Sequence, residues 1–398
     1  MTARLHYEDP YLLEFDAAVV ARREHAGRPA VILDRTAFYA ESGGQPWDTG
    51  VLADVLVVAV IEDQGEILHV LERPLASDRV HGRVDGDRRR DHRQQHHGQH
   101  LLSRAFVRVV EAHTLSFHLG SETSSIDLDR YVGEQEIAAA ERLVNEVIWE
   151  SRPVRILTVD REEARRMGVE PPAEAGATIR LIEVQGFDLQ ACGGTHPSST
   201  SEVGIVVVTG TERYKGGSRI QFLCGQRALT AFRRRVCVLE RVGALLSAPL
   251  EGLPEAVERA LAHVTETARR AQALLEQAVE SEARRLLAEA ADDPAVIVST
   301  YDGWPPADLK GLALRLVSLR RCLVLLGSRS DGKAYVVVAQ ADGLPHDVPG
   351  LLKHALGPLS GRGGGKGNLA QGGAESADQL ESALRAASLV AGSARKPA

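Results

Sequence analysis

The chain has 398 residues, 44% of them hydrophobic and 25% charged, which is the composition of a folded globular protein and more chain than one ordinary core holds. It contains no apolar run long enough to cross a bilayer and opens without the apolar stretch of a signal peptide, so we expect a cytoplasmic protein with no membrane contact. A net charge of −7 argues against a uniformly basic surface, and four cysteines are too few for a disulfide framework.

Residues 1–80 are predicted to be rich in β-strands, because β-branched residues cluster there between turn signals. The expected strands are Phe15–Val20, Ala30–Leu33, Val51–Ile61 and Ile67–Val70. The segment Ser42–Pro46 has the composition of a turn, which would bring the Gln45 side chain to an accessible position.

An HxxxH motif follows at His96–His100. Apolar residues recur after it at helical spacing, which predicts a helix over residues 94–113. Because residues four apart share one face of a helix, the imidazoles of His96 and His100 are expected to project together. The basic stretch that leads into this helix is either a solvated face or a surface for RNA phosphates, and its members are Arg88, Arg89, Arg90 and Arg93.

A CxxxH motif, Cys192–His196, has two glycines that allow a tight turn, so its Cys and His side chains can converge. Either motif alone is weak evidence, because close pairs arise by chance among 14 histidines and a buried Cys commonly acts as a small hydrophobe. Together the motifs supply three imidazoles and one thiolate, a set that zinc favours in tetrahedral geometry. We therefore predict one Zn²⁺ per chain, held by His96, His100, Cys192 and His196.

Strands and helices alternate around the CxxxH motif. An amphipathic helix is expected at Glu134–Trp149. The expected strands are Ile126–Leu128, Val154–Val159, Ile179–Val184, Ile205–Thr209 and Ile220–Leu223. The turn before the last of these strands is basic, and we take Lys215 and Arg219 as further candidates for RNA contact.

The amino-acid composition changes after Cys224. Residues 226–246 and 254–291 are rich in Ala, Leu, Glu and Arg and predict an antiparallel helical hairpin. The strands Val296–Ser299, Leu323–Leu326 and Tyr335–Ala339 then alternate with helices near 306–319, 347–356 and 376–389. The prediction is an α+β multidomain protein with an N-terminal β-barrel-like domain (1–90), an α/β zinc domain (91–225), a helical hairpin (226–293) and a small C-terminal α/β domain (294–398).

A glycine-rich run, Gly361–Gly373, lies within the C-terminal domain. Its composition favours a flexible loop, and the alternative is a backbone cradle for phosphate in which Lys366 supplies a positive charge. The run is not a P-loop, because Gly367 rather than Ser or Thr follows Lys366.

Several of these segments resemble a known family. Gln95–Ser103 and Gly186–Pro197 are similar to the two zinc motifs of alanyl-tRNA editing domains. Gly363–Gly373 resembles the C-terminal domain of alanyl-tRNA synthetase, which is shared with DHH-type phosphoesterases. Further segments that fit the family are Thr36–Tyr39, Gly43–Pro46, Glu150–Val154 and Phe222–Gly225. No aminoacylation domain precedes the β-rich region, so the resemblance is to free-standing editing proteins of the long AlaX type.

The resemblance implies zinc-dependent hydrolysis of Ser-tRNA(Ala), with Gly-tRNA(Ala) left open as a second substrate. A synthetase pocket rejects an extra hydroxyl by only about 1–3 kcal/mol, so a second, hydrolytic site is needed. In that site the resemblance implies Thr36 as the contact to the serine hydroxyl, and Gln45 is a candidate to orient water or substrate. The C-terminal domain would hold the tRNA body, and a homodimer through the hairpin or this domain is a further expectation.

Two points stay open at this stage. Four protein ligands would close the zinc coordination, whereas a catalytic zinc usually keeps one position free, so we expect His196 to bind weakly or to yield to water or substrate. His97 stands where the family more usually has a small residue such as Thr, and it is either a bystander or an alternate ligand. The alternative function is a non-catalytic RNA-binding protein with a structural zinc.

Overall fold

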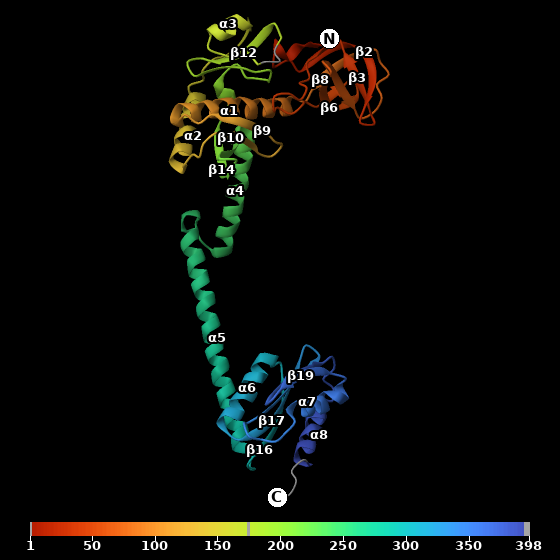
Figure 1. Ribbon diagram of the computed structural model, residues 1–398, viewed down its shortest axis with the longest axis vertical. Coiled ribbons are helices and arrows are strands. Elements are labelled where there is room, and N and C mark those ends of the chain that lie inside the picture. The colour runs from red at the N-terminus through yellow and green to blue at the C-terminus, as the bar shows by residue number, and fades with distance from the viewer. Residues whose placement is uncertain (1, 173–175, 394–398) are drawn as a thin grey trace. The chain divides into compact units, whose positions relative to one another are not determined.

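The computed structural model describes residues 2–172 and 176–393 of a mixed α+β protein with several sheets. The chain forms two compact units, Met1–Val242 and Gly243–Ala398, each of which is described by itself (Figure 1).

The first unit begins with a closed six-stranded barrel whose strands follow the order β2-β3-β7-β6-β5-β8. The strands are β2 (Glu14–His25), β3 (Arg28–Leu33), β5 (Gly50–Leu52), β6 (Val55–Asp63), β7 (Glu66–Leu71) and β8 (Arg79–Val84). Alternate residues of β8 are buried, as expected for a strand with one face toward a barrel core. The predicted single strand Val51–Ile61 is wrong, because the chain reverses at Ala53, which has a φ of 52°, and forms the hairpin β5–β6.

Two short strands, β1 (Ala3–Arg4) and β4 (Arg35–Thr36), pair in parallel beside the barrel, and the 3-10 turn η1 (Leu5–Tyr7) follows β1.

Helix α1 (Gly86–Val110) leaves the barrel and carries the HxxxH motif (Figure 1). It starts eight residues before the predicted position, because the Asp85 carboxylate accepts hydrogen bonds from the N–H groups of Asp87 and Arg88 and so caps the helix. It ends at Glu111, which adopts a left-handed φ of 53°. The basic stretch predicted to precede the helix therefore forms its first turns.

The α1 helix packs on a core that two sheets and helix α2 (Glu134–Trp149) complete. Leu101 and Phe106 of α1, Val144 of α2 and Phe222 of the larger sheet are all fully buried there. The larger sheet has the order β14-β15-β10-β9, from β9 (Thr114–Leu119), β10 (Ser124–Leu128), β14 (Val206–Tyr214) and β15 (Gly217–Cys224). The smaller sheet consists of β11 (Val154–Asp160), β12 (Thr178–Val184) and β13 (Asp188–Ala191), with α3 (Arg161–Arg166) and the 3-10 turn η2 (Thr200–Val203) beside them.

The two long helices predicted after residue 225 are present as α4 (Gly225–Leu246) and α5 (Leu253–Glu289), with the 3-10 turn η3 (Leu250–Gly252) between them. The boundary between the two compact units falls inside α4, after Val242. The antiparallel pairing of the two helices therefore stays a prediction. No helix in the described ranges 2–172 and 176–393 has the length and apolar character to span a bilayer.

The second unit contains α5 and a five-stranded sheet of order β16-β17-β18-β20-β19 with helices on its faces. Only the pair β16–β17 is parallel among its neighbouring strands. The elements are β16 (Ala295–Asp302), α6 (Pro306–Leu319), β17 (Cys322–Ser330), β18 (Lys333–Gln340), α7 (Val348–Leu356), the 3-10 turn η4 (Gly357–Leu359), β19 (Arg362–Lys366), β20 (Leu369–Ala374) and α8 (Leu380–Ser393).

The glycine-rich run is not a loop. It forms the β19–β20 hairpin at the edge of the sheet, turning at Gly367 with a φ of 66°. The glycines are needed because the strands touch closely: a Cβ at Gly363 would lie 2.6 Å from the Cα of Gly372. The loop prediction was wrong because composition does not reveal this pairing.

Candidate metal centre

The α1 helix places His96 and His100 on one buried face. Their Nε2 atoms lie 3.1 Å apart, and the His96 side chain is 1% exposed. The third group, Cys192, follows the end of β13, and its Sγ lies 3.1 Å from the Nε2 of His96. The HxxxH and CxxxH motifs, far apart in the chain, thus meet at one point.

The Cys-Gly-Gly-Thr-His loop reaches the helix because Gly194 has no side chain. An ideal Cβ at Gly194 would lie 2.5 Å from Cε1 of His96, closer than real Cβ contacts allow. The Gly194 N–H also donates to the Cys192 Sγ over 3.3 Å. His196, two residues on, is fully buried, and its Nε2 has no hydrogen-bond partner among the described residues.

These four side chains fit a metal ion. One ligand atom from each of His96, His100, Cys192 and His196 lies within 4.8 Å of all the others. Tetrahedral zinc with its usual bond lengths separates its ligand atoms by about 3.3–3.6 Å, close to the two 3.1 Å separations seen here. The unpartnered Nε2 of His196 is the atom that an ion would satisfy.

Burial keeps the imidazoles neutral, which is the state that binds a metal. It lowers the pKa of His100 to about 3, with Arg180 nearby adding to the effect, and lowers the pKa values of His96 and His196 well below the usual range. Burial raises the pKa of the Cys192 thiol. A bound cation would act the other way and favour the thiolate.

His97 lies behind the cluster rather than in it. Its Nδ1 is 3.0 Å from the Nδ1 of His196, so the two rings share a hydrogen bond, and His97 is not one of the four clustered ligands. Burial and the neighbouring His100 lower the pKa of His97 to about 3. Contacts of this kind fix the tautomer and orientation of a metal-binding imidazole.

The barrel holds the CxxxH loop in place through Gln45. The Gln45 Nε2 donates to the Thr195 hydroxyl over 3.0 Å, and the Thr195 N–H donates back to the Gln45 Oε1 over 3.1 Å. Gly44 packs against β9, where a Cβ would lie 2.5 Å from the Phe117 ring. Gln45 is fully buried, so the structure shows a brace between barrel and loop in place of the accessible position expected of the turn.

Three family models match segments of the chain, and known proteins match most of it. Family models match for tRNA synthetases class II (A) over residues 10–88, for the threonyl and alanyl tRNA synthetase second additional domain over 179–221, and for the DHHA1 domain over 293–392. The alanyl-tRNA editing protein AlaX-L of Pyrococcus horikoshii is 32% identical over 386 residues, which covers 94% of both chains. The chain belongs to the alanyl-tRNA editing family.

The family that the motifs resembled is thereby confirmed. The alanine–tRNA ligase of Pyrococcus furiosus is 34% identical over 398 residues, covering 93% of this chain and 42% of the ligase. The chain thus spans about two fifths of the length of the alanine–tRNA ligases that it matches. Among solved structures, the C-Ala domain of Aquifex aeolicus alanyl-tRNA synthetase is similar with a TM-score of 0.23 and 24% identity, over 24% of this chain and 87% of that domain.

Thr36, the residue expected from the family to contact serine, is fully buried at the barrel. Its Oγ1 lies 2.8 Å from the Nε2 of His69, and it accepts a hydrogen bond from the Phe38 N–H over 3.1 Å. The other ring nitrogen of His69 lies 3.2 Å from the backbone oxygen of Val31. Two of the three hydrogen-bonding positions of the Thr36 hydroxyl are therefore taken within the barrel.

Arg89 departs from its expected RNA-binding role. Its side chain is 1% exposed and forms an ion pair with Asp48, which is fully buried. Its guanidinium also donates to the backbone oxygens of Pro10 (3.1 Å) and Ala37 (2.6 Å). These contacts tie the start of α1 to the barrel and leave no donor facing solvent, so Arg89 leaves the set of RNA-binding candidates.

The other basic candidates differ in how free their charges are. Arg90 is 61% exposed and pairs with the exposed Asp87. Lys215 is exposed on the β14–β15 turn. Arg219 is half-buried and forms a bidentate pair with Asp127. Arg88 donates to the backbone oxygen of Trp47, Arg93 packs over the Tyr11 ring near Glu202, and Lys366 is exposed on β19.

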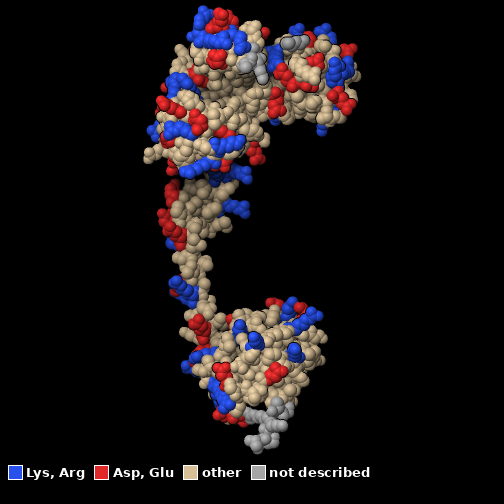
Figure 2. Space-filling model, in the orientation of Figure 1, with Lys and Arg blue, Asp and Glu red and all other residues tan. Residues whose placement is uncertain are grey.

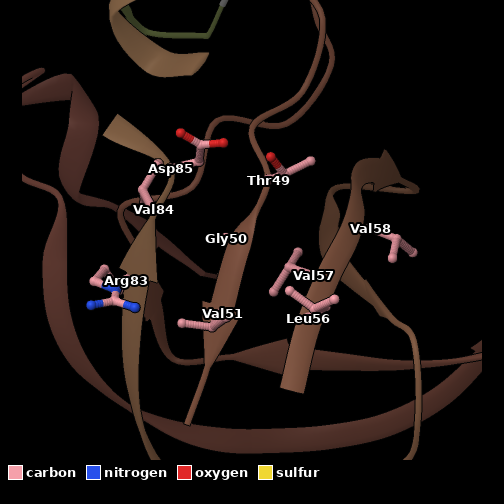
Figure 3. A pocket seen from close by; sticks show the side chains of 9 residues that line it. All are labelled: Thr49, Gly50, Val51, Leu56, Val57, Val58, Arg83, Val84 and Asp85. Atoms are coloured by element: carbon pink, nitrogen blue, oxygen red, sulfur yellow. The ribbon is translucent and has the colours of Figure 1, made fainter. Parts of the chain in front are cut away.

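Over the barrel face visible in Figure 2, basic and acidic side chains are interspersed. A groove of about 520 Å³ lies along β5, with Arg83 on one side of Val51 and Leu56 and Val57 on the other (Figure 3). It contains none of the predicted site residues, and its valine-rich lining offers little chemistry.

Two buried or half-buried charged side chains, Asp48 and Arg180, were not predicted from the sequence. The burial of Asp48 was not expected, because a carboxylate in a loop is ordinarily solvated. Arg180 was overlooked because it lies within the predicted strand Ile179–Val184. A single Arg in an apolar strand nevertheless predicts a hydrogen-bonding partner for its guanidinium. Its Nη1 donates to the backbone oxygens of Cys192 (2.7 Å) and Gly194 (3.0 Å) and so shapes the CxxxH loop.

Proposed function

We propose that the chain is a zinc-dependent hydrolase that deacylates mischarged Ser-tRNA(Ala), with Gly-tRNA(Ala) as a second substrate. The observation that carries the proposal is the convergence of His96, His100, Cys192 and His196 in a chain of the alanyl-tRNA editing family. A role in translation fidelity would place the protein in the cytoplasm.

The residues around the centre prepare it in three ways. Burial keeps the three imidazoles neutral and thus ready to bind Zn²⁺. His97 orients His196, while Gln45 and Arg180 hold the backbone of the CxxxH loop. When bound, zinc supplies Lewis acidity toward an ester carbonyl or water. The Gly194 N–H steadies the Cys192 sulfur by donating a hydrogen bond to it.

A selective editing site must leave the ester of Ala-tRNA(Ala) intact. A site that hydrogen-bonds the serine hydroxyl leaves a buried polar group unpaired when alanine is bound, and this disfavours the correct product. Thr36 is our candidate for that contact, because its oxygen keeps one acceptor position after its bonds to His69 and Phe38. The Thr36→Val variant should reduce the ratio of Ser-tRNA(Ala) to Ala-tRNA(Ala) hydrolysis.

The tRNA would be held by phosphate contacts. We propose Arg88, Arg90, Arg93, Lys215, Arg219 and Lys366 for this role. Arg90, Lys215 and Lys366 are the most exposed of these and offer charges that a phosphate can reach.

A homodimer through α5 is a related proposal. Val257, Leu261 and Val264 are exposed at heptad-like spacing on this helix, with Val264 65% exposed. Light scattering after size exclusion gives the mass directly, and a monomer at micromolar concentration would contradict the proposal.

The deciding experiment is deacylation of Ser-, Gly- and Ala-tRNA(Ala) by the zinc-loaded chain, with and without a chelator. We expect rapid loss of the serine ester, slow loss of the alanine ester and no activity with chelator. Cys192→Ala should abolish activity, whereas Cys237→Ala, at an exposed cysteine of α4, is the matched control. Rapid hydrolysis of Ala-tRNA(Ala) would contradict a proofreading role.

The second candidate is a non-catalytic RNA-binding protein with a structural zinc. The observation in its favour is the set of four converging protein ligands, which is typical of closed structural sites. Equal deacylation by wild type and Cys192→Ala, together with unchanged tRNA binding, would support this candidate.

A further inference from the structure

A guanidinium beside the metal centre has donors that no described residue uses. Arg180 lies in β12, and its Nη1 is occupied by the backbone oxygens of Cys192 and Gly194. Its Nε and Nη2 are inaccessible to solvent and have no acceptor within residues 2–172 and 176–393. These two atoms form one edge of the planar group, the edge that grips a carboxylate or phosphate with two parallel hydrogen bonds.

In the described part of the chain no carboxylate pairs with the Arg180 guanidinium, whose Nε and Nη2 have no hydrogen-bond partner there. Its Cζ lies 5.3 Å from the centroid of the Tyr7 ring. Cys192 becomes negative on binding a metal, but the cation then balances that charge. Two guanidinium donors that neither solvent nor protein satisfies are costly unless an acceptor joins them, and an anion is the acceptor that a cation favours.

We propose that the Nε–Nη2 edge of Arg180 binds a negatively charged oxygen of the substrate. This inference rests on the proposed deacylase function and adds a substrate contact that the metal ligands do not provide. One source of the oxygen is a phosphodiester of the tRNA acceptor end, near the scissile ester. The other source is the ester carbonyl oxygen during hydrolysis.

The second source follows from the electron balance of the reaction. Water adds to the carbonyl carbon and releases a proton, while the π electron pair of the C=O bond moves to the oxygen, which becomes negative. When the C=O bond forms again, the bond to the ribose oxygen breaks, and that oxygen takes up a proton. A donor pair fixed beforehand stabilises the negative oxygen without reorganisation.

The test uses the zinc-loaded full chain with Arg180→Lys, which keeps the charge but loses the paired edge, and Arg180→Ala, which loses both. Arg108→Lys is the matched control, because Arg108 holds the backbone oxygens of Gly186 and Phe187 as Arg180 holds those of Cys192 and Gly194. The substrates are Ser-tRNA(Ala) and 2′(3′)-O-seryl-adenosine, which has no phosphate. Rates are expressed per bound zinc, so that loss of metal cannot imitate loss of the contact.

We expect kcat/KM of Arg180→Ala to fall by about 100-fold or more, with a smaller fall for Arg180→Lys and none for Arg108→Lys. A fall on both substrates, mainly in kcat, assigns the contact to the carbonyl oxygen. A fall on the tRNA alone, with weaker binding of an uncharged acceptor minihelix, assigns it to a phosphodiester. Values within about threefold of wild type on both substrates would overturn the proposal.

The failure of this inference is distinct from failure of the proposed function. If the wild-type chain leaves both esters intact, the deacylase proposal fails. In that case the anion contact is tested only by the affinity of the uncharged minihelix for wild type and for Arg180→Ala. Equal affinities would reject an anion contact at Arg180.

Discussion

The buried ion pair between Arg89 and Asp48 allows a quantitative test of how the metal-bearing helix is anchored. We consider Arg89→Met, which fills similar space without charge. The change leaves the Asp48 carboxylate buried with the Tyr39 N–H as its remaining donor. Leaving one partner of a buried ion pair without the other costs about 3–5 kcal/mol. The backbone oxygen of Ala37 loses its donor for about 1 kcal/mol, whereas that of Pro10 keeps the Arg93 guanidinium as a donor at 3.4 Å. We therefore expect a loss of about 5 kcal/mol.

The second variant, Asp48→Asn combined with Arg89→Met, removes the stranded charge but keeps an acceptor for Tyr39. It should recover about half of the lost stability, because the charge penalty is the larger contribution. The control is Arg90→Met, one residue along the same helix, whose exposed pair with Asp87 should contribute less than about 1 kcal/mol.

The assay is urea unfolding followed by tryptophan fluorescence in a Trp304→Phe background, which leaves Trp47 and Trp149 to report on the first unit. An Arg89→Met urea midpoint equal to that of Arg90→Met would show that the buried ion pair does not anchor the helix. A double variant no more stable than Arg89→Met would show that the unpaired Asp48 charge is not the main cost.

Three further outcomes are expected. Gly194→Ala should lose zinc in metal analysis, because its Cβ would lie 2.5 Å from the His96 ring. The control Gly193→Ala, whose Cβ would lie 3.3 Å from the nearest atom, should retain zinc, and equal zinc contents of the two variants would contradict this expectation. Burial lowers the pKa of His69 to about 4 from 6.5, so between these values the unfolded chain binds more protons and stability falls as the pH falls. His69→Gln should therefore lessen the loss of unfolding free energy between pH 6.5 and 5 by about 2 kcal/mol, and an unchanged loss would argue against it. Arg90→Ala should lower the salt dependence of tRNA binding by about one unit of log–log slope if it contacts a phosphate, and an unchanged slope would remove it from the interface.

The metal centre was the part of the site most accessible from sequence. Helical spacing forces His96 and His100 together, and the glycines of the CxxxH motif permit the close approach that Gly194 makes to His96. The long helices were accessible for the same reason, since their periodic patterns extend over many residues.

Features that depend on contacts between distant segments were not accessible. A run of basic residues is typical of a solvated helix face. The neighbouring sequence therefore did not distinguish Arg89, which is buried against Asp48, from Arg90, which is exposed. The partner of Gln45 is Thr195, 150 residues away, and turn composition could not reveal it. The glycine-rich run looked like a loop because the pairing of Gly363 with Gly372 is a property of the sheet.

X-ray absorption spectroscopy at the zinc edge of the purified chain measures whether the HxxxH and CxxxH motifs bind one zinc ion together. We expect one zinc per chain with a single sulfur at about 2.3 Å and two or three nitrogens at about 2.0–2.1 Å, with the sulfur lost in Cys192→Ser. A shell of oxygen and nitrogen without sulfur in the wild type, or a chain that retains no zinc, would contradict a shared zinc site.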